Sequence, residues 1–296
     1  MEKIYLSDAG PKVSPAIYGF YRWAEENDPA TTMREVVSRC LESGINTFDH
    51  ADVYGHYRCE TLFGDLMHSG LFRRQDVILF ARCGIVLPDP ARPDIRVKHY
   101  NTSKPHILAS VDNSLRRLRT DYIDVFLLDH LDPLSDPEET ALTLTRLKES
   151  GKIKFIGVAN YTVFQHQLLA AFLRLPVVTS QVDFNLLQTE ALDNGRIDYI
   201  KQRFMRPLAS SPLAAGRIAT GTDAVAIRVR KKLLEIAPRY EADIESVAVA
   251  WLIKCGALPL IGTTSLQRIK NIAGSFNIDL DRQDWYDLYA AAKGGV

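Results

Sequence analysis

The sequence predicts a single (β/α)8 barrel, the TIM-barrel fold, and three observations support this prediction. Short β-branched or apolar runs recur at intervals of roughly thirty residues, and each is followed by a segment of helical periodicity. Eight such units fit within the 296 residues. No Pro/Gly/Ser-rich linker or change of composition divides the chain, so residues 1–296 are expected to form one barrel domain with a C-terminal helix. An open, doubly wound sheet is the alternative.

The predicted strands cover residues 15–20, 45–50, 77–83, 123–129, 154–160, 177–184, 205–210 and 258–263. Helix start and stop signals bound the segments 31–43, 104–118, 136–150 and 162–173. Two more helical stretches, 223–243 and 244–255, lengthen the connection between the last two strands, and residues 280–294 predict the C-terminal helix. The Pro- and Arg-rich segment 87–101 is expected to be a loop, either functional or an ordinary surface insertion.

The composition indicates a globular protein that acts on a small molecule. Lys plus Arg and Asp plus Glu both number 36, and this zero net charge argues against nucleic acid or an anionic membrane as a partner. No secretory signal opens the chain, and no apolar stretch approaches the roughly 20 residues that span a bilayer. The scattered Cys40, Cys59, Cys83 and Cys255 fit reduced thiols, so a cytoplasmic location is expected. The oligomeric state is not indicated.

Polar residues gather where the predicted strands end, which is where barrel enzymes carry their chemistry. From the second strand to the seventh these residues are Asp49 with Tyr54 after it, Arg82, Asp129 with His130, Asn160, Gln181 with Asp183, and Ser210 with Ser211. Buried polar groups must be hydrogen-bonded or charge-paired, so they are expected to form a network or to contact a ligand. Tyr54 could protonate a nascent alkoxide if a nearby cation such as Arg82 lowers the pKa of its phenol.

A metal site in the stretch "NTFDHADVYGHYRCE" is the competing interpretation. Its Asp49, His50, Asp52 and His56 do not have a spacing that puts three ligands on one face, and therefore no metal is expected. His50 lies on the opposite strand face from Asp49, so a packed histidine is expected there.

Five motifs together resemble the aldo-keto reductase family. They are "TFDHADVYG", "VANYT", "TSQVDFN", "ASSPLAAGRI" and "PLIGTTSLQRI", and they follow the family order over nearly the whole chain. The resemblance implies a barrel that binds NADPH without a Rossmann fold, and the sequence has no G-x-G-x-x-G after a strand.

The resemblance also implies roles for individual residues. Asp49 and Tyr54 match two of the family's four active-site residues, with Tyr54 as the proton donor to the carbonyl oxygen. Asn160 and Gln181 would hold the nicotinamide carboxamide. The run from Ser211 through Leu213 to Gly216 would lie along the pyrophosphate, and Ser265 and Arg268 at a helix start would hold the adenosine 2′-phosphate.

The sequence departs from the family pattern at four positions of this site. Arg82 stands where the family has a lysine and Asp129 where it has a histidine. Ser210 replaces the aromatic residue that stacks on the nicotinamide, and Ala159 replaces a serine. Because a guanidinium pairs well with a carboxylate, we expect an Arg82–Asp129 ion pair that keeps Asp129 ionised and weakens carbonyl reduction.

Three functions are compatible with these departures. The first is an NADPH-dependent reductase of an aldehyde, ketone or enone, in which Asp129 could imitate the glutamic acid of the enone-reducing members. The second is a non-redox lyase or isomerase with Asp129 or Tyr54 as base, and the third is a nucleotide-binding protein with little reductase activity. Strand alternation turns His130 away from the site unless a bulge intervenes.

Overall fold

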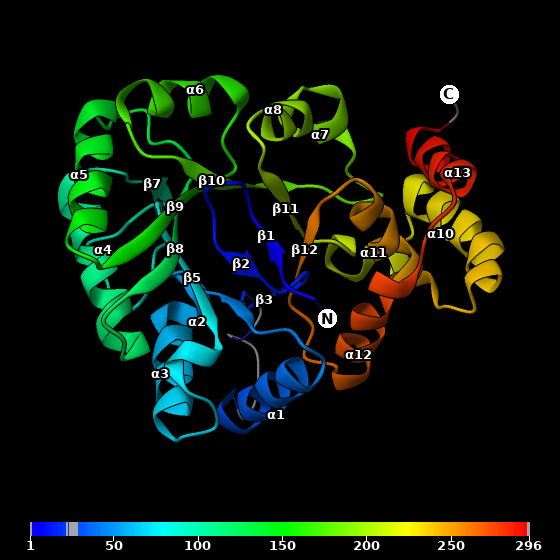
Figure 1. Ribbon diagram of the computed structural model, residues 1–296, viewed down its shortest axis with the longest axis horizontal. Helices are drawn as coiled ribbons and strands as arrows, with labels where there is room; N and C mark the ends of the chain where they lie inside the picture. The colour runs from blue at the N-terminus through cyan, green and yellow to red at the C-terminus, as the bar shows by residue number, and fades with distance from the viewer. Residues whose placement is uncertain (1, 22, 24–28, 295–296) are drawn as a thin grey trace.

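The chain folds into a closed, eight-stranded parallel barrel inside a ring of helices (Figure 1). The computed structural model describes residues 2–21, 23 and 29–294. Around the barrel the strand order is β10-β11-β12-β3-β4-β5-β8-β9. These strands are β3 (Ile17–Gly19), β4 (Thr47–Asp49), β5 (Ile78–Cys83), β8 (Ile123–Asp129), β9 (Ile153–Ala159), β10 (Val177–Asp183), β11 (Arg206–Ser210) and β12 (Leu258–Ile261). The predicted TIM barrel is therefore confirmed, and the open sheet is not.

Most helices of the outer ring lie close to the predicted segments, whereas α3 and α8 were not predicted. They are α1 (Pro29–Glu42), α3 (Cys59–His68), α4 (Lys104–Leu118), α5 (Pro137–Glu149), α6 (Val163–Phe172), α8 (Arg196–Gln202), α10 (Ala224–Ile236), α11 (Ile244–Lys254), α12 (Leu266–Gly274) and α13 (Arg282–Lys293). Aspartates cap several of them, since Asp136, Asp223 and Asp243 each accept hydrogen bonds from backbone N–H groups of the first turn. None of the helices in the described residues is long and apolar enough to cross a membrane.

Side chains from seven of the eight strands fill the barrel interior with apolar groups. Val125 and Leu127 of β8 belong to this interior cluster, whereas Phe126 and Leu128 of the same strand pack among the helices α4, α5 and α6. This alternation directs Asp129, two residues after Leu127, toward the barrel axis. A polar residue is thereby placed at the end of an apolar column.

An N-terminal hairpin closes the bottom of the barrel, a feature that the sequence did not predict. Its strands are β1 (Ile4–Tyr5) and β2 (Lys12–Val13), drawn in dark blue within the ring of Figure 1. Leu6 and Val13 are buried in the barrel-interior cluster. The hairpin does not cover the opposite end of the barrel, where the strands end and the candidate active site lies.

The loop after β5 contains a second hairpin with strands β6 (Ile85–Val86) and β7 (His99–Tyr100). Gly84 leads into it with φ of 126°, and a Cβ there would lie 2.2 Å from the Asp129 carbonyl oxygen. A glycine is therefore required between β5 and the hairpin. The predicted loop 87–101 thus includes a strand at its C-terminal end.

The C-terminal helix α13 packs on α10, and a symmetric tryptophan pair joins it to α11. The indole N–H of Trp251 in α11 donates to the Trp285 carbonyl oxygen at 3.1 Å, and that of Trp285 in α13 donates to the Trp251 carbonyl oxygen at 3.0 Å. The two rings stack with centroids 4.9 Å apart. This pair fastens the last helix to the ring.

Candidate active site

Three neighbouring strands bring charged side chains to the carboxyl end of the barrel. Asp49 ends β4, Arg82 is the residue before the end of β5, and Asp129 ends β8. All three are buried, with Arg82 1% and Asp49 0% exposed. Tyr54 begins the short helix α2 (Tyr54–Tyr57), five residues after Asp49 in the chain.

Arg82 pairs with both carboxylates, but its hydrogen bond is to Asp49. The Arg82 Nη2 donates to Asp49 Oδ1, whereas Nη1 lies 3.6 Å from Asp129 Oδ2. The expected Arg82–Asp129 ion pair is therefore present without a hydrogen bond. The expectation missed the closer partner, Asp49. Burial lowers the pKa of Arg82, but attraction to Asp49, Tyr54 and Asp129 outweighs it and raises the pKa, so the guanidinium stays charged.

Asp129 is surrounded by hydrogen-bond donors. His130 Nδ1 and Asn160 Nδ2 each lie 2.7 Å from Asp129 Oδ1. Burial raises the pKa of Asp129, while the His130 hydrogen bond, the Arg82 charge and the Asn160 hydrogen bond lower it below its usual value. Asp129 is therefore ionised at neutral pH, and His130 donates to it through Nδ1.

The prediction that His130 points away from the site is wrong. Its φ of 64° places it in the left-handed region immediately after β8 ends, so strand alternation no longer applies. The ring turns back onto Asp129 and stacks on Tyr100 of β7, with centroids 4.5 Å apart and an interplanar angle of 7°. The imidazole thereby joins the site from the position next to that of the family histidine.

The Tyr54 phenol lies within the electrostatic field of the three charged residues. Burial raises its pKa above the usual value, Arg82 acts to lower it, and Asp49 and Asp129 act to raise it. Burial also raises the pKa of Asp49, opposed by Arg82 and by the Tyr54 hydroxyl. The four residues therefore form one group in which two carboxylates face a single guanidinium.

The histidines of the opening stretch do not form a metal cluster. His50 is fully buried, its ring stacked on Phe20 at 4.6 Å and edge-on to Phe63, so the expectation of a packed histidine is confirmed. His56 Nδ1 lies 3.1 Å from Asp89 Oδ2. Across residues 2–21, 23 and 29–294, no group of three or more His, Cys, Asp and Glu residues is arranged to hold a metal.

Asn160 and Gln181 follow the same arc of strand ends on the other side of Asp129. Asn160 has a φ of 61° and uses its amide N–H to bind Asp129, which leaves its carbonyl oxygen for another partner. Gln181 is 6% exposed, and its Oε1 has no hydrogen-bond partner among the described residues. An orphaned buried amide oxygen beside Asn160 is a suitable acceptor for a ligand N–H.

The segment after β11 has an irregular backbone. Ser210 donates to Asp183 Oδ1 at 2.7 Å, which draws its side chain toward β10. Ser211 and Gly216 have φ of 50° and 90°, while Leu213 between them packs against the buried cores. Within this loop the Ala214 N–H donates to the Ser211 carbonyl oxygen at 2.7 Å and the Gly216 N–H to the Leu213 carbonyl oxygen at 2.9 Å, so an anion here would have to bind other groups of the run.

The start of α12 carries Ser265 and Arg268. Ser265 is the N-cap, accepting from the Arg268 N–H at 3.4 Å. The Arg268 guanidinium, however, lies 3.0 Å from Glu245 Oε1 of α11. A phosphate at this helix start would therefore compete with Glu245 for Arg268.

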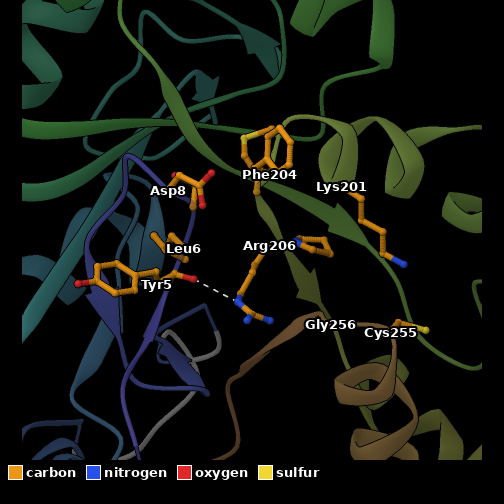
Figure 2. A pocket seen from close by; sticks show the side chains of 11 residues that line it. Tyr5, Leu6, Asp8, Lys201, Phe204, Arg206, Cys255 and Gly256 are labelled. Atoms are coloured by element: carbon orange, nitrogen blue, oxygen red, sulfur yellow. Dashed lines mark hydrogen bonds between the residues drawn. The ribbon is translucent and has the colours of Figure 1, made fainter.

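One cavity in the described chain lies far from these residues, at the opposite end of the barrel. It has a volume of about 320 Å³, and its lining includes Tyr5, Lys201, Arg206 and Cys255 (Figure 2). Arg206 there donates from Nε to the Tyr5 carbonyl oxygen at 3.1 Å. This contact ties the N-terminal hairpin to the start of β11.

Comparisons with known proteins agree with the sequence motifs and the barrel. The profile of the Aldo/keto reductase family matches residues 17–293. The chain is 37% identical to the protein named "uncharacterized oxidoreductase YcsN" of Bacillus subtilis, and 35% identical to a 6-dehydroglucose reductase of Agrobacterium fabrum. Each of these alignments covers 99% of both chains. The fold resembles the crystal structure of the thermostable aldo-keto reductase Tm1743, with a TM-score of 0.85 at 21% identity over 98% of this chain and 100% of that one.

Proposed function

Since the chain belongs to the Aldo/keto reductase family of NAD(P)H-dependent oxidoreductases, we propose that it uses NADPH to reduce an aldehyde, ketone or enone with an altered set of catalytic charges. The observation that supports this most is the convergence of Asp49, Tyr54, Arg82 and Asp129 at the carboxyl ends of three adjacent strands. The reductase is one barrel domain over residues 1–296. A cytoplasmic location, expected from the scattered cysteines, stays a prediction.

Tyr54 is the proton donor in this proposal. When bound, the nicotinamide supplies the hydride that reduces the carbonyl carbon. The Tyr54 hydroxyl gives its proton to the oxygen on which negative charge develops. Burial and the two carboxylates raise the pKa of Tyr54 and oppose this transfer, while Arg82 favours it, so carbonyl reduction is slower than it would be with a single carboxylate.

Reduction of an enone is the less favoured branch of the proposal. That chemistry would need a protonated Asp129 to polarise the substrate carbonyl. The lowered pKa of Asp129, surrounded by His130, Arg82 and Asn160, opposes protonation. Aldehydes and ketones are therefore the substrates to test first.

The cofactor would lie along the neutral side of the barrel mouth. The unpartnered Gln181 Oε1 and the Asn160 carbonyl oxygen suit the two N–H atoms of the nicotinamide carboxamide. Ser210 and the run from Ser211 to Gly216 would contact the adjoining ribose and pyrophosphate, and Ser265 with Arg268 the 2′-phosphate. The Arg268–Glu245 contact must open for that last interaction, which reduces the preference for NADPH over NADH.

Similarity to a 6-dehydroglucose reductase guides the choice of substrate. A carbonyl derivative of a sugar would bring several hydroxyl groups to a mouth that presents His130 and Tyr100. Both side chains can form hydrogen bonds with such hydroxyls. Sugar-derived aldehydes therefore belong in the first substrate panel, beside simple aldehydes and enones.

Two measurements test the proposal against its alternatives. Titration with NADPH and NADH, followed by quenching of tryptophan fluorescence, should give saturable binding; an absence of binding would leave the non-redox lyase or isomerase. Transfer of deuteride from labelled NADPH to a carbonyl should follow. Binding without transfer to any compound of the panel would instead favour a nucleotide-binding protein with little reductase activity.

The altered charges can be tested by restoring the family residues. The double variant Arg82→Lys with Asp129→His should raise kcat for a simple aldehyde by about tenfold or more, because it removes one negative charge near Tyr54. Steady-state kinetics with a saturating nucleotide would measure the change. An unchanged kcat would mean that Arg82 and Asp129 do not slow the proton transfer from Tyr54.

A further inference from the structure

The turn that follows Tyr54 has an unusual backbone. Gly55, His56 and Tyr57 all lie in the left-handed region, with φ of 57°, 54° and 64°. Glycine adopts this region readily, but His56 and Tyr57 carry side chains that disfavour it. Two consecutive non-glycine residues in this conformation require outside contacts to hold them.

The first of these contacts is between Tyr57 and the loop 87–98, which joins β6 to β7. The Tyr57 hydroxyl donates to the Leu87 carbonyl oxygen at 3.1 Å and accepts from the Leu87 N–H at 3.3 Å. A single phenol therefore satisfies both backbone groups of one loop residue. A hydroxyl suits this position because one oxygen both donates and accepts, whereas a phenylalanine ring could do neither.

Two further contacts fix the same turn to the same loop. The Arg92 guanidinium lies 3.6 Å from the centroid of the Tyr57 ring, and Asp89 Oδ2 lies 3.1 Å from His56 Nδ1. Asp89 in turn accepts from the Ala91 N–H at 2.9 Å. Each left-handed side chain thus has a loop partner of its own.

The end of the hairpin at Tyr100 lies close to Asp129, on the other side of the charged site from Tyr57. Tyr100 of β7 stacks on His130, and His130 hydrogen-bonds Asp129. The hairpin from Ile85 to Tyr100 therefore contacts the turn after Tyr54 directly and the Asp129 carboxylate through His130. One surface element links the two halves of the charged site.

We propose that Tyr57 is a positioning residue for Tyr54. Its hydroxyl binds both backbone groups of Leu87, and its ring lies against the Arg92 guanidinium. These contacts hold the left-handed turn that sets the direction of the Tyr54 phenol. The position of the loop therefore determines the position of the proton donor. The catalytic part of this inference rests on the proposed function, because it assumes that Tyr54 protonates the substrate. The structural part, a turn held by the loop, does not.

Tyr57→Phe tests the inference because it removes the two hydrogen bonds and keeps the ring. We expect kcat for an aldehyde to fall about tenfold, since a small misplacement of a proton donor slows the chemical step, while KM for NADPH changes less than about twofold. Arg92→Leu should act in the same direction, and Arg92→Lys should restore part of the loss because it keeps a cation over the ring. His99→Ala is the matched control, since His99 lies in the same hairpin and its side chain contacts the Val97 carbonyl oxygen.

Two readouts do not depend on turnover. Trypsin should cleave after Arg96 and Lys98, which are exposed in the loop, faster in Tyr57→Phe than in His99→Ala. The backbone amide resonances of Tyr54 and Gly55 in ¹⁵N-labelled protein should shift in Tyr57→Phe and stay in place in His99→Ala.

The outcomes separate the two proposals. Faster cleavage, shifted Tyr54 and Gly55 resonances and a reduced kcat support the inference. An unchanged kcat in an active enzyme, or unshifted Tyr54 and Gly55 resonances, overturns it. If the wild-type chain reduces no carbonyl compound, the proposed function fails, and the resonances alone decide whether Tyr57 positions Tyr54.

Discussion

The two sides of the barrel mouth use different kinds of polar group. On the side of β4, β5 and β8, the buried groups are charged and paired, namely Asp49, Arg82 and Asp129. On the side of β9, β10 and β11, they are neutral, and Gln181 Oε1 is buried without a partner among the described residues. A buried unpaired charge costs several kcal/mol, whereas an unpartnered amide oxygen costs about 1–3 kcal/mol. The chain can therefore keep neutral groups available for a ligand, but it must pair its charges when it folds.

The largest predicted effect is a loss of catalytic rate, without a loss of nucleotide affinity, when a residue of the charged side is changed. Tyr54→Phe removes the proposed proton donor, so kcat/KM for an aldehyde should fall by roughly 10²–10⁴-fold. The Kd for nucleotide should stay within about twofold, because Tyr54 lies on the other side of the mouth from Gln181. Stopped-flow hydride transfer and fluorescence titration measure the two quantities. If nucleotide affinity fell as much as kcat/KM, Tyr54 would act in cofactor binding as well, and the separate roles of the two sides would be contradicted.

The next effect should be on stability. Arg82→Met leaves Asp49 and Asp129 buried without their cation, and the free energy of unfolding should fall by about 3–5 kcal/mol. Arg82→Lys is the control, since it keeps the charge and should lose less. Urea unfolding at neutral pH measures both variants. A loss below about 1 kcal/mol for Arg82→Met would indicate that the carboxylates are not held by this guanidinium.

A pH dependence of stability should also arise on the charged side. Burial, and then the charge of Glu60, raises the pKa of Asp52 to about 7, although Ser110 donates to it at 2.8 Å. Between pH 4 and 7 the unfolded chain loses this proton before the folded chain does, so stability falls as the pH rises, by up to about 4 kcal/mol. Asp52→Asn should flatten that decline. Urea unfolding at pH 5 and pH 7.5 would check it, and an equal slope in the variant and wild type would exclude Asp52 as the source.

The smallest effect should come from the neutral side and should have the opposite pattern. Gln181→Leu removes the unpartnered amide oxygen, so the stability of the free protein should stay the same or rise slightly. The Kd for nucleotide should rise about tenfold, the cost of one lost hydrogen-bonding group at a ligand. Thermal unfolding with and without NADPH measures both changes. A destabilised free protein with an unchanged Kd would mean that Gln181 stabilises the barrel and does not bind the nucleotide.

The fold was predictable because its signal is repeated along the chain. Each apolar run gave a strand and each capped segment a helix, and helix α4 was bounded correctly at both ends. The shorter strands were overestimated, since the run 15–20 gave only Ile17–Gly19. The N-terminal hairpin was missed because strands of two residues leave no periodicity to detect.

The site was less predictable because its contacts depend on distances between separate strands. The sequence brought Arg82 and Asp129 together, but it could not show that Asp49 is the closer partner. Strand alternation gave the wrong direction for His130, since the strand ends one residue earlier. The Arg268–Glu245 pair depends on which faces of α11 and α12 meet. Tyr57 was missed too, although a glycine between two tyrosines in "YGHY" is a signal for a special turn.

The stacked Trp251–Trp285 pair gives the chain a built-in spectroscopic label. Two parallel indoles 4.9 Å apart couple their electronic transitions, so they should produce a paired positive and negative band in circular dichroism. Trp23, the third tryptophan, belongs to a different core cluster and packs against Phe20. The dichroism couplet therefore reports whether α13 stays attached during unfolding, independently of changes in emission from Trp23 near the barrel mouth.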